Sequence, residues 1–176
     1  SGTTWTDLSV NNRNGTLVSP TVSASTGSTP RSLTMGSGKY ATLSSGFSDF
    51  TAGLTIQATL DLGAANMWER TIDFGKDFNG GSYVWGDGDS SHNVLLAREG
   101  TTSNLALHVY GARGTGILGA CTAANAIVSG VQNYAVTLVP SGGSTSCVMY
   151  RNGVALSTSN NISRMPDNTT RDSNFV

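Results

Sequence analysis

The sequence predicts an all-β protein, built as a sandwich or barrel of antiparallel sheets with little or no helix. The first observation is composition: Gly, Ser, Thr and Asn fill 81 of the 176 positions, whereas Lys, Glu and Gln together fill six. The straight-chain residues that favour helices are therefore nearly absent from the sequence, which argues against a helical fold. The second observation is a series of short alternating apolar and polar segments, which start roughly every 10 to 15 residues and are bounded by turn-forming residues.

The clearest alternation covers Leu54–Leu60. A repeat of two residues places Leu54, Ile56, Ala58 and Leu60 on one face of a strand. Weaker alternation predicts seven further strands: Tyr40–Leu43, Arg70–Phe74, Ser82–Trp85, Val94–Arg98, Leu105–Tyr110, Tyr134–Val139 and Cys147–Arg151.

Three other segments complete the predicted architecture. Asn152-Gly153 supplies the two residues with positive φ that a tight hairpin turn requires. The Gly- and Ala-rich segment from Arg113 to Gly130 is expected to be a long loop that carries one short strand. Helix is expected only as a turn or two near Gly63 to Trp68.

Charge and hydropathy exclude two classes of partner. The net charge is -1, and the two Lys and eight Arg residues are scattered, so no basic stripe is available for nucleic acid or for anionic membranes. No apolar run approaches the roughly 20 residues of a membrane span. Because 38% of the residues are hydrophobic, we expect one domain over residues 1–176, with neither nucleic-acid binding nor membrane insertion.

The two cysteines, Cys121 and Cys147, are compatible with one disulfide or with two buried thiols. We predict the disulfide, which would join the long loop to the strand before the Asn152-Gly153 hairpin. A chain rich in Ser, Thr, Gly and Asn is of a kind common outside the cytoplasm. We therefore expect an extracellular, cell-surface or virion-surface location, where sequons at Asn14, Asn161 and Asn168 matter only if the host glycosylates.

Several segments, taken in order, carry a resemblance to a known family. They are Trp5-Thr-Asp-Leu-Ser9, Asn14-Gly-Thr-Leu17, Gly38-Lys-Tyr-Ala-Thr-Leu43, Phe50 to Leu60, Trp68-Glu-Arg-Thr-Ile-Asp-Phe-Gly75, Tyr134-Ala-Val-Thr137 and Tyr150-Arg-Asn-Gly-Val154. Together they resemble a laminin-G-like or pentraxin-like domain of the concanavalin A-like lectin and glucanase fold. The resemblance implies an antiparallel β-sandwich of the jelly-roll type.

The sequence departs from the family pattern at two places, and the resemblance also implies an expectation about the chain end. Lys39 stands where relatives often have an acidic residue, and Gln132-Asn133-Tyr134 replaces a Trp-His-His-like segment. The family normally continues with one or two more strands. The resemblance therefore implies a fragment of a longer chain, with a sheet edge at Asn174-Phe175-Val176 that further sequence or a neighbouring chain would close.

Catalysis is not expected. The one same-face acidic pair on a predicted strand is Glu69 and Asp73, which are four residues apart and therefore about 13 to 14 Å from each other. Glycoside hydrolysis requires carboxylates about 5 to 9.5 Å apart, so Asp73 is better interpreted as a hydrogen-bonding residue at a strand end. No Gly-x-Ser-x-Gly elbow is present, and His108 is expected to be solvated or hydrogen-bonded.

Two turns are candidates for a calcium site. Asp77 and Asn79 lie in the first and Asp87 and Asp89 in the second, with Gly nearby, and hard cations prefer such oxygen ligands. The alternative is that Asp, Asn and Gly are ordinary hairpin residues. Some pentraxin-like relatives bind calcium through an Asp-Asn pair in a loop after the corresponding strand. The resemblance therefore implies that these turns bind calcium.

The aromatic residues Tyr83 and Trp85 lie beside the two turns and could stack on sugar rings, although core packing is the alternative. We therefore expect a non-catalytic recognition or adhesion module of a larger extracellular or virion-surface protein, with a glycan or a surface protein as its partner. The alternative is a structural assembly module, such as a capsid decoration, fibre or surface-layer domain, with self-association or shell contacts. A glycoside hydrolase is the less favoured third hypothesis.

Overall fold

The computed structural model describes residues 3–19, 21–22, 32–35, 38–63, 66–76, 91–112 and 115–176. Within these ranges the chain forms antiparallel strands and turns, and no residue is helical. The described part of the chain accordingly has no helix long and apolar enough to cross a membrane. The predicted all-β class is confirmed.

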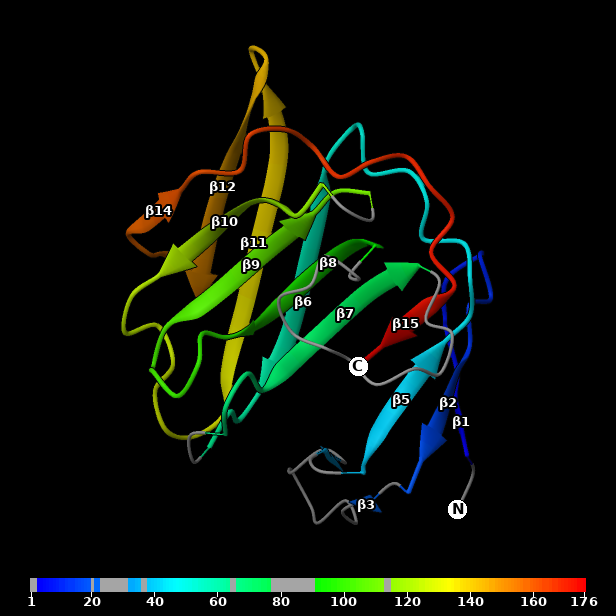
Figure 1. Ribbon diagram of the computed structural model, residues 1–176. Coiled ribbons are helices and arrows are strands. Elements are labelled where there is room, and N and C mark those ends of the chain that lie inside the picture. Colours follow the sequence, from blue (N-terminus) through cyan, green and yellow to red (C-terminus); the bar gives the residue numbers. More distant parts are fainter. Residues whose placement is uncertain are drawn as a thin grey trace.

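The larger sheet has nine strands in the order β1-β2-β5-β15-β7-β8-β9-β10-β14 (Figure 1). Its strands are β1 (Thr4–Trp5), β2 (Gly15–Val18), β5 (Tyr40–Leu43), β7 (Arg70–Lys76), β8 (Ser91–Arg98), β9 (Leu105–Tyr110), β10 (Ile117–Ala123), β14 (Thr158–Asn160) and β15 (Ser173–Phe175).

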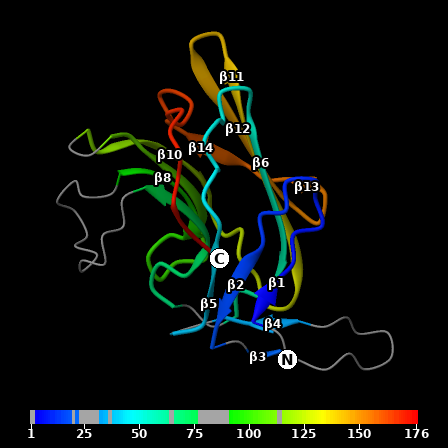
Figure 2. The ribbon, with the colours of Figure 1, turned by 90° about the vertical axis from the view of Figure 1, so that its right-hand side faces the viewer.

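The smaller sheet has four strands in the order β13-β12-β11-β6. They are β6 (Leu54–Leu60), β11 (Gln132–Ser141), β12 (Ser144–Arg151) and β13 (Val154–Ala155), and a separate two-stranded sheet pairs β3 (Thr21–Val22) with β4 (Leu33–Thr34). Seen from the side, the two large sheets form two layers (Figure 2).

The hydrophobic core lies between these two layers, as expected for a β-sandwich. The larger sheet contributes Val94, Leu96, Leu107 and Val109, and the smaller sheet contributes residues such as Val136, all of them buried. Within each strand these residues alternate with side chains on the other face, which is the pattern from which the strands were predicted. The sandwich is therefore confirmed, whereas the jelly-roll connectivity stays a prediction.

The predicted strand bounds agree well with the structure. β5, β6 and β9 begin and end where the alternation does, and four others extend the predicted ranges by a few residues. The strand predicted at Ser82–Trp85 lies outside the described residues. In the predicted hairpin Asn152 has φ 51° and Gly153 has φ 79°, and the turn connects β12 to β13.

The long loop predicted between Arg113 and Gly130 is wrong in part, because β10 is a full seven-residue strand between β9 and β14. Its small residues hid it from the alternation. Gly119 has φ 137°, and a Cβ there would lie 2.4 Å from the Asn161 carbonyl oxygen. The strand needs this glycine because the segment leaving β14 crosses it closely.

The helical turn predicted near Gly63 to Trp68 is also not found among the described residues of that segment. Trp68 has φ 54°, which a right-handed helix does not permit, and its N–H donates to the Gly100 carbonyl at 2.9 Å. A contact with a distant turn therefore replaces the local helical hydrogen bond.

The end of the chain does not form a sheet edge. β15 lies inside the nine-stranded sheet, where Phe175 pairs with Thr42 of β5 and with Asp73 of β7. The predicted open edge at Asn174-Phe175-Val176 is therefore wrong. The sequence pattern shows that this segment contains apolar residues, but it does not show which two strands pair with it.

Arg171 anchors the segment that leads into β15. Its side chain is fully buried, and its guanidinium donates to the carbonyls of Phe47, Ser48, His92, Asp167 and Thr169 at 2.9 to 3.3 Å. The guanidinium also lies over the Phe50 ring, 4.8 Å from its centroid. Burial lowers the pKa of Arg171 to about 10, with Asp167 acting in the opposite direction, so the side chain stays charged at neutral pH.

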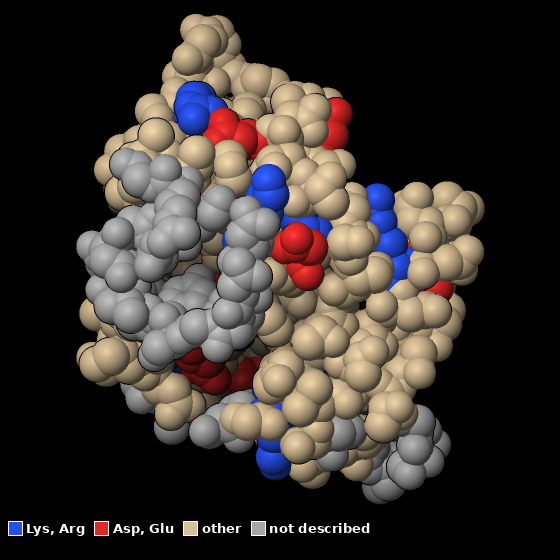
Figure 3. Space-filling model, turned by 45° about the vertical axis from the view of Figure 1, so that its right-hand side comes forward, with Lys and Arg blue, Asp and Glu red and all other residues tan. Residues whose placement is uncertain are grey.

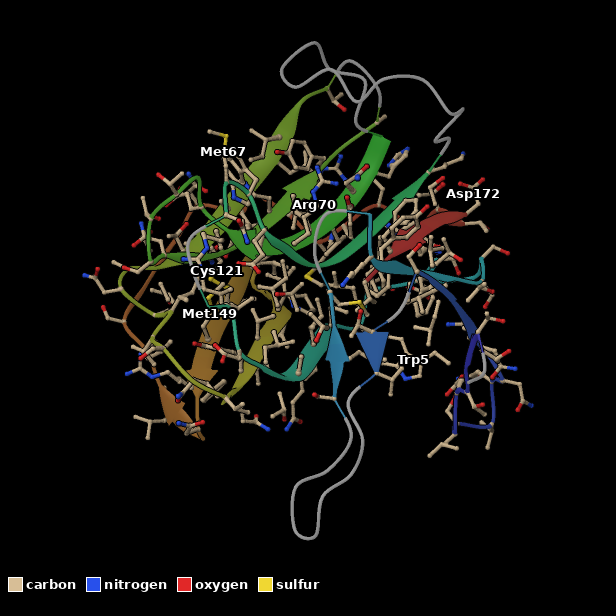
Figure 4. All side chains as sticks on the ribbon, turned by 90° about the horizontal axis from the view of Figure 1, so that it is seen from below. Trp5, Met67, Arg70, Cys121, Met149 and Asp172 are labelled. Carbon is tan, nitrogen blue, oxygen red and sulfur yellow. A yellow bond between two sulfur atoms is a disulfide. The ribbon has the colours of Figure 1, made fainter. Side chains whose placement is uncertain are left out.

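A disulfide joins the two layers. Cys121 of β10 and Cys147 of β12 are bonded, with their Cα atoms 6.3 Å apart. Figure 4 shows Cys121 and Met149 in the interior between the sheets. The bond therefore connects the end of the larger sheet near β14 to the smaller sheet.

Replacing Arg171 by Met should destabilise the fold strongly, because it deprives five part-buried carbonyls of the guanidinium donor. We expect the free energy of unfolding to fall by on the order of 3 kcal/mol in urea denaturation. The control is Arg164→Met, since Arg164 is half exposed and its one ion pair among the described residues is with Asp167, and it should cost less than about 1 kcal/mol. Equal losses in the two variants would contradict the anchoring role of Arg171.

Removing the disulfide in a Cys121→Ala, Cys147→Ala double variant should also destabilise the domain. The bond closes a loop with a sequence separation of 26, for which chain entropy predicts about 3.5 kcal/mol. Urea denaturation measures the loss. Thiol titration of the denatured, unreduced wild type should find no free thiol, and two free thiols would refute the bond.

Candidate functional site

The candidate site lies on the outer face of the nine-stranded sheet, defined as the face turned away from the four-stranded sheet. The register places Asp73 of β7 opposite Leu95 of β8, and Leu95 opposite His108 of β9. The neighbours of these residues, including Phe74 and Val109, belong to the core. Because side chains alternate between faces, the Asp73, Leu95 and His108 side chains form one row on the outer face.

Asp73 is held by two other side chains at this face. It is 2% exposed, and its Oδ1 accepts a hydrogen bond from Asn93 Nδ2 at 2.8 Å. Its Oδ2 forms an ion pair with Arg70. Figure 4 shows Arg70 on the opposite side of the larger sheet from Met149. Asp73 is thus a hydrogen-bonding residue, as predicted, but it lies within β7 rather than at a strand end.

His108 is buried between two aromatic rings. The Trp68 ring meets the imidazole edge-on with centroids 5.5 Å apart, and the Tyr110 ring stacks on it at 6.3 Å. His108 is 6% exposed, and neither ring nitrogen has a hydrogen-bond partner among the described residues. The expectation of a solvated or hydrogen-bonded histidine is therefore wrong, because the alternation gives the face of the side chain but not what packs above it.

Burial also sets the protonation state of this site. It lowers the pKa of His108, against a smaller opposing effect of Glu99, so the imidazole is neutral at pH 7. Burial raises the pKa of the Tyr110 phenol. The charge of Arg70 acts against this rise, and the charge of Asp73 adds to it. The outer-face site, defined as Trp68, Arg70, Asp73, His108 and Tyr110, therefore presents an uncharged imidazole and an uncharged phenol beside a neutralised ion pair.

A hollow of about 520 Å³ continues the same face towards β14. Thr122 lies in it, is paired with Ala106 of β9, and alternates with the core residues Cys121 and Ala123. The lining is polar, and consists of Glu99, Asn104, Thr122, Ala124, Ser157, Thr158 and Ser159. Glu99 connects the two parts, since its charge also acts on His108.

The two acids that the sequence predicts on one strand face, Glu69 and Asp73, are engaged separately, and Glu69 directly precedes β7. Glu69 pairs with Arg98 at 3.3 Å, and Arg98 also donates to the Leu62 carbonyl at 2.6 Å. Asp73 is occupied by Arg70 and Asn93. Each carboxylate thus has a structural partner.

The predicted calcium ligands Asp77, Asn79, Asp87 and Asp89, and the predicted stacking residues Tyr83 and Trp85, lie outside the described residues. The calcium site therefore stays a prediction. Among the residues that are described, no group of three or more His, Cys, Asp or Glu side chains is arranged to hold a metal ion.

The sequence contained signals for the outer-face site that the strand pattern alone did not connect. Trp68, Arg70 and Asp73 belong to one motif, and His108 and Tyr110 occupy alternate positions of one strand. These residues meet because β7 and β9 both neighbour β8 in the sheet and because the turn before β7 places Trp68 over the same face. Both are features of tertiary structure.

The lowered pKa of His108 predicts a loss of stability in mild acid. The unfolded chain binds a proton below about pH 6.5, whereas the folded imidazole resists protonation. The unfolded state then holds more protons, so the free energy of unfolding should decrease as the pH falls from 7 towards the lowered pKa. Asp167, whose pKa is lowered chiefly by Arg164, adds a further loss only near and below pH 4.

Urea denaturation between pH 7 and pH 5 measures this loss. The variant His108→Phe should flatten the dependence, and the control Tyr110→Phe should keep it, since it retains the imidazole. An unchanged slope in His108→Phe would show that another group is responsible.

Comparisons of the chain with protein-family models, with curated proteins and with solved structures found no match. The resemblance to laminin-G-like and pentraxin-like domains therefore stays a prediction.

Proposed function

We propose that this domain is a non-catalytic recognition module that binds a neutral carbohydrate at the outer-face site. The observation that carries the proposal is His108, which is buried between the Trp68 and Tyr110 rings with both nitrogens unpaired among the described residues. Buried polar atoms are normally hydrogen-bonded, and an unpaired pair at an aromatic cluster favours a ligand as the missing partner.

The chemistry of the site favours hydroxyl groups. A neutral imidazole offers one N–H donor and one acceptor nitrogen, and a sugar hydroxyl can complement either. Trp68 and Tyr110 are half-buried, and the parts of their rings that stay accessible beside His108 suit the apolar C–H face of a sugar ring. The hydroxyl groups and the C–H face of one sugar ring can therefore be bound at the same site.

Charge favours a neutral ligand over an acidic one. Arg70 is paired with Asp73, so the cation at the site is already compensated. The face drawn in Figure 3 shows its Lys, Arg, Asp and Glu side chains singly or in small groups among uncharged residues. With a net charge of -1, the chain also lacks a long-range field that would attract anions.

The hollow beside β14 favours a ligand longer than one sugar. It shares the outer face, and its hydroxyl and amide lining from Thr122, Ser157, Ser159 and Asn104 suits further hydroxyls. An oligosaccharide that lies along the face would contact both parts. The structural engagement of Glu69 and Asp73 supports binding without hydrolysis.

Within this proposal the domain serves adhesion by a larger extracellular or virion-surface protein. The calcium site at Asp77, Asn79, Asp87 and Asp89, with Tyr83 and Trp85 nearby, stays a separate prediction. A glycan array, probed with calcium and with a chelator, tests both ideas together. Chelator-sensitive binding would support the calcium site, and chelator-resistant binding would support the outer-face site alone.

Replacing Trp68 by Ala should weaken glycan binding because it removes one stacking face. We expect the dissociation constant of the best neutral glycan from the array to rise about 3- to 10-fold in calorimetry. The matched control is Trp5→Ala, since Trp5 is 41% exposed on the distant strand β1 and should not affect binding. Unchanged affinity in Trp68→Ala, or equal losses in both variants, would contradict the outer-face site.

A further inference from the structure

β6 forms an unprotected edge of the four-stranded sheet. It has seven residues, its pairing with β11 is continuous, and it contains no charged residue and no proline. Edge strands are usually protected by shortness, charge, proline or a bulge. The other outer strands of the two large sheets in the described chain are β1, β13 and β14, each only two or three residues long.

The main-chain groups on this open side can be assigned from the pairing. Asn152 N–H donates to the Asn133 carbonyl, so odd-numbered residues of β11 turn towards β12 and even-numbered ones towards β6. Val136 is opposite Ile56, which therefore turns towards β11. Alternation then leaves three β6 residues whose N–H and C=O groups point to the open side, where no described residue pairs with them: Thr55, Gln57 and Thr59.

The core is incompletely covered at the same edge. On β11 the inward-facing Tyr134, Val136 and Leu138 are at most 1% exposed. On β6 the inward-facing Ile56 is buried, whereas the inward-facing Leu54, Ala58 and Leu60 are only partly buried. Burial thus decreases from β11 to β6, which leaves apolar side chains beside unpaired main-chain groups.

The larger sheet extends beyond this edge. The disulfide places β10 opposite β12, and counting along both sheets places β8 opposite β6. Five strands of the larger sheet, β7, β15, β5, β2 and β1, then have no counterpart in the smaller sheet. Figure 1 shows β15, β5, β2 and β1 lying to one side of β6.

This overhang decides which partner fits. If two copies paired as antiparallel β6 strands about a two-fold axis perpendicular to the sheet, their overhanging nine-stranded sheets would lie in the same layer and occupy the same space. A single extended segment needs only the width of one strand, about 4.8 Å, beside β6. The geometry therefore favours an added strand over an edge-to-edge dimer.

We propose that the open edge of β6 binds an extended segment of another protein chain as an additional β-strand. The segment has apolar side chains at alternate positions, which cover Leu54, Ala58 and Leu60. Its intervening side chains are uncharged and polar, beside the exposed Thr55, Gln57 and Thr59. Main-chain hydrogen bonds supply affinity and the alternate side chains supply specificity. This contact is independent of the outer-face site.

Amide hydrogen exchange on the isotope-labelled domain tests the proposal. The probes are a set of octapeptides in which Val, Ile, Leu or Tyr alternates with Thr. At least one should slow the exchange of the amides of Thr55, Gln57 and Thr59. The Ile56 and Ala58 amides, which already face β11, should not change.

The variant Gln57→Pro removes the central outward N–H and should raise the peptide dissociation constant roughly tenfold or more. Proline is tolerated at an edge position whose N–H faces solvent, so β6 should still pair with β11. The matched control Gln57→Val should bind as the wild type does, and Thr59→Pro is a second variant should Gln57→Pro fail to fold.

Four results would overturn the proposal. The first three are the absence of binding by every peptide of the set, binding that Gln57→Pro and Thr59→Pro leave unchanged, and protection confined to residues outside β6. The fourth is protection of β6 that rises with protein concentration without peptide, since it would assign the edge to a second copy.

Discussion

The nine-stranded sheet depends on the insertion of β15 between β5 and β7. β15 has only three residues, of which two pair with β5 and three with β7. Arg171 and Asn174 add side-chain hydrogen bonds to this pairing: the first binds five carbonyls, and the second donates to the carbonyls of Ser44 and Arg171 at 3.1 and 3.0 Å. The bonds from Arg171 to Phe47 and Ser48 and from Asn174 to Ser44 join segments more than 120 residues apart, which is a costly closure for a folding chain.

The same anchor positions the outer-face site. Arg171 binds the carbonyl of His92 near the start of β8, and Phe175 of β15 is the ladder partner of Asp73. The strands that carry Asp73, Asn93 and His108 are therefore held from one side by the C-terminal segment. A site on strands supported in this way keeps its geometry better than one on turns alone.

The unequal width of the two sheets gives the molecule two chemically different surfaces. The outer face presents side chains, with the buried imidazole of His108 between the Trp68 and Tyr110 rings. The β6 edge presents main-chain N–H and C=O groups, which no described residue pairs, beside partly buried apolar residues. One surface suits a ligand recognised by its hydroxyls and ring faces, and the other suits a polypeptide recognised by its backbone. Recognition of hydroxyls and ring faces is the property that an adhesion module needs, and recognition of a polypeptide backbone is the property that an assembly module needs.

The amino-acid sequence by itself determined the fold class and most of the strands. Leu54–Leu60 alternates without error, and Asn152-Gly153 prescribes its own turn, because face alternation and positive φ are local properties of the chain. Asp73 was also recognisable as a hydrogen-bonding residue. Only the tertiary structure decided that small residues around Gly119 form a strand, that Phe175 lies inside a sheet and that His108 is buried with no hydrogen-bond partner among the described residues. Strand order and the packing above a face depend on contacts between distant segments, which no local pattern of residues encodes.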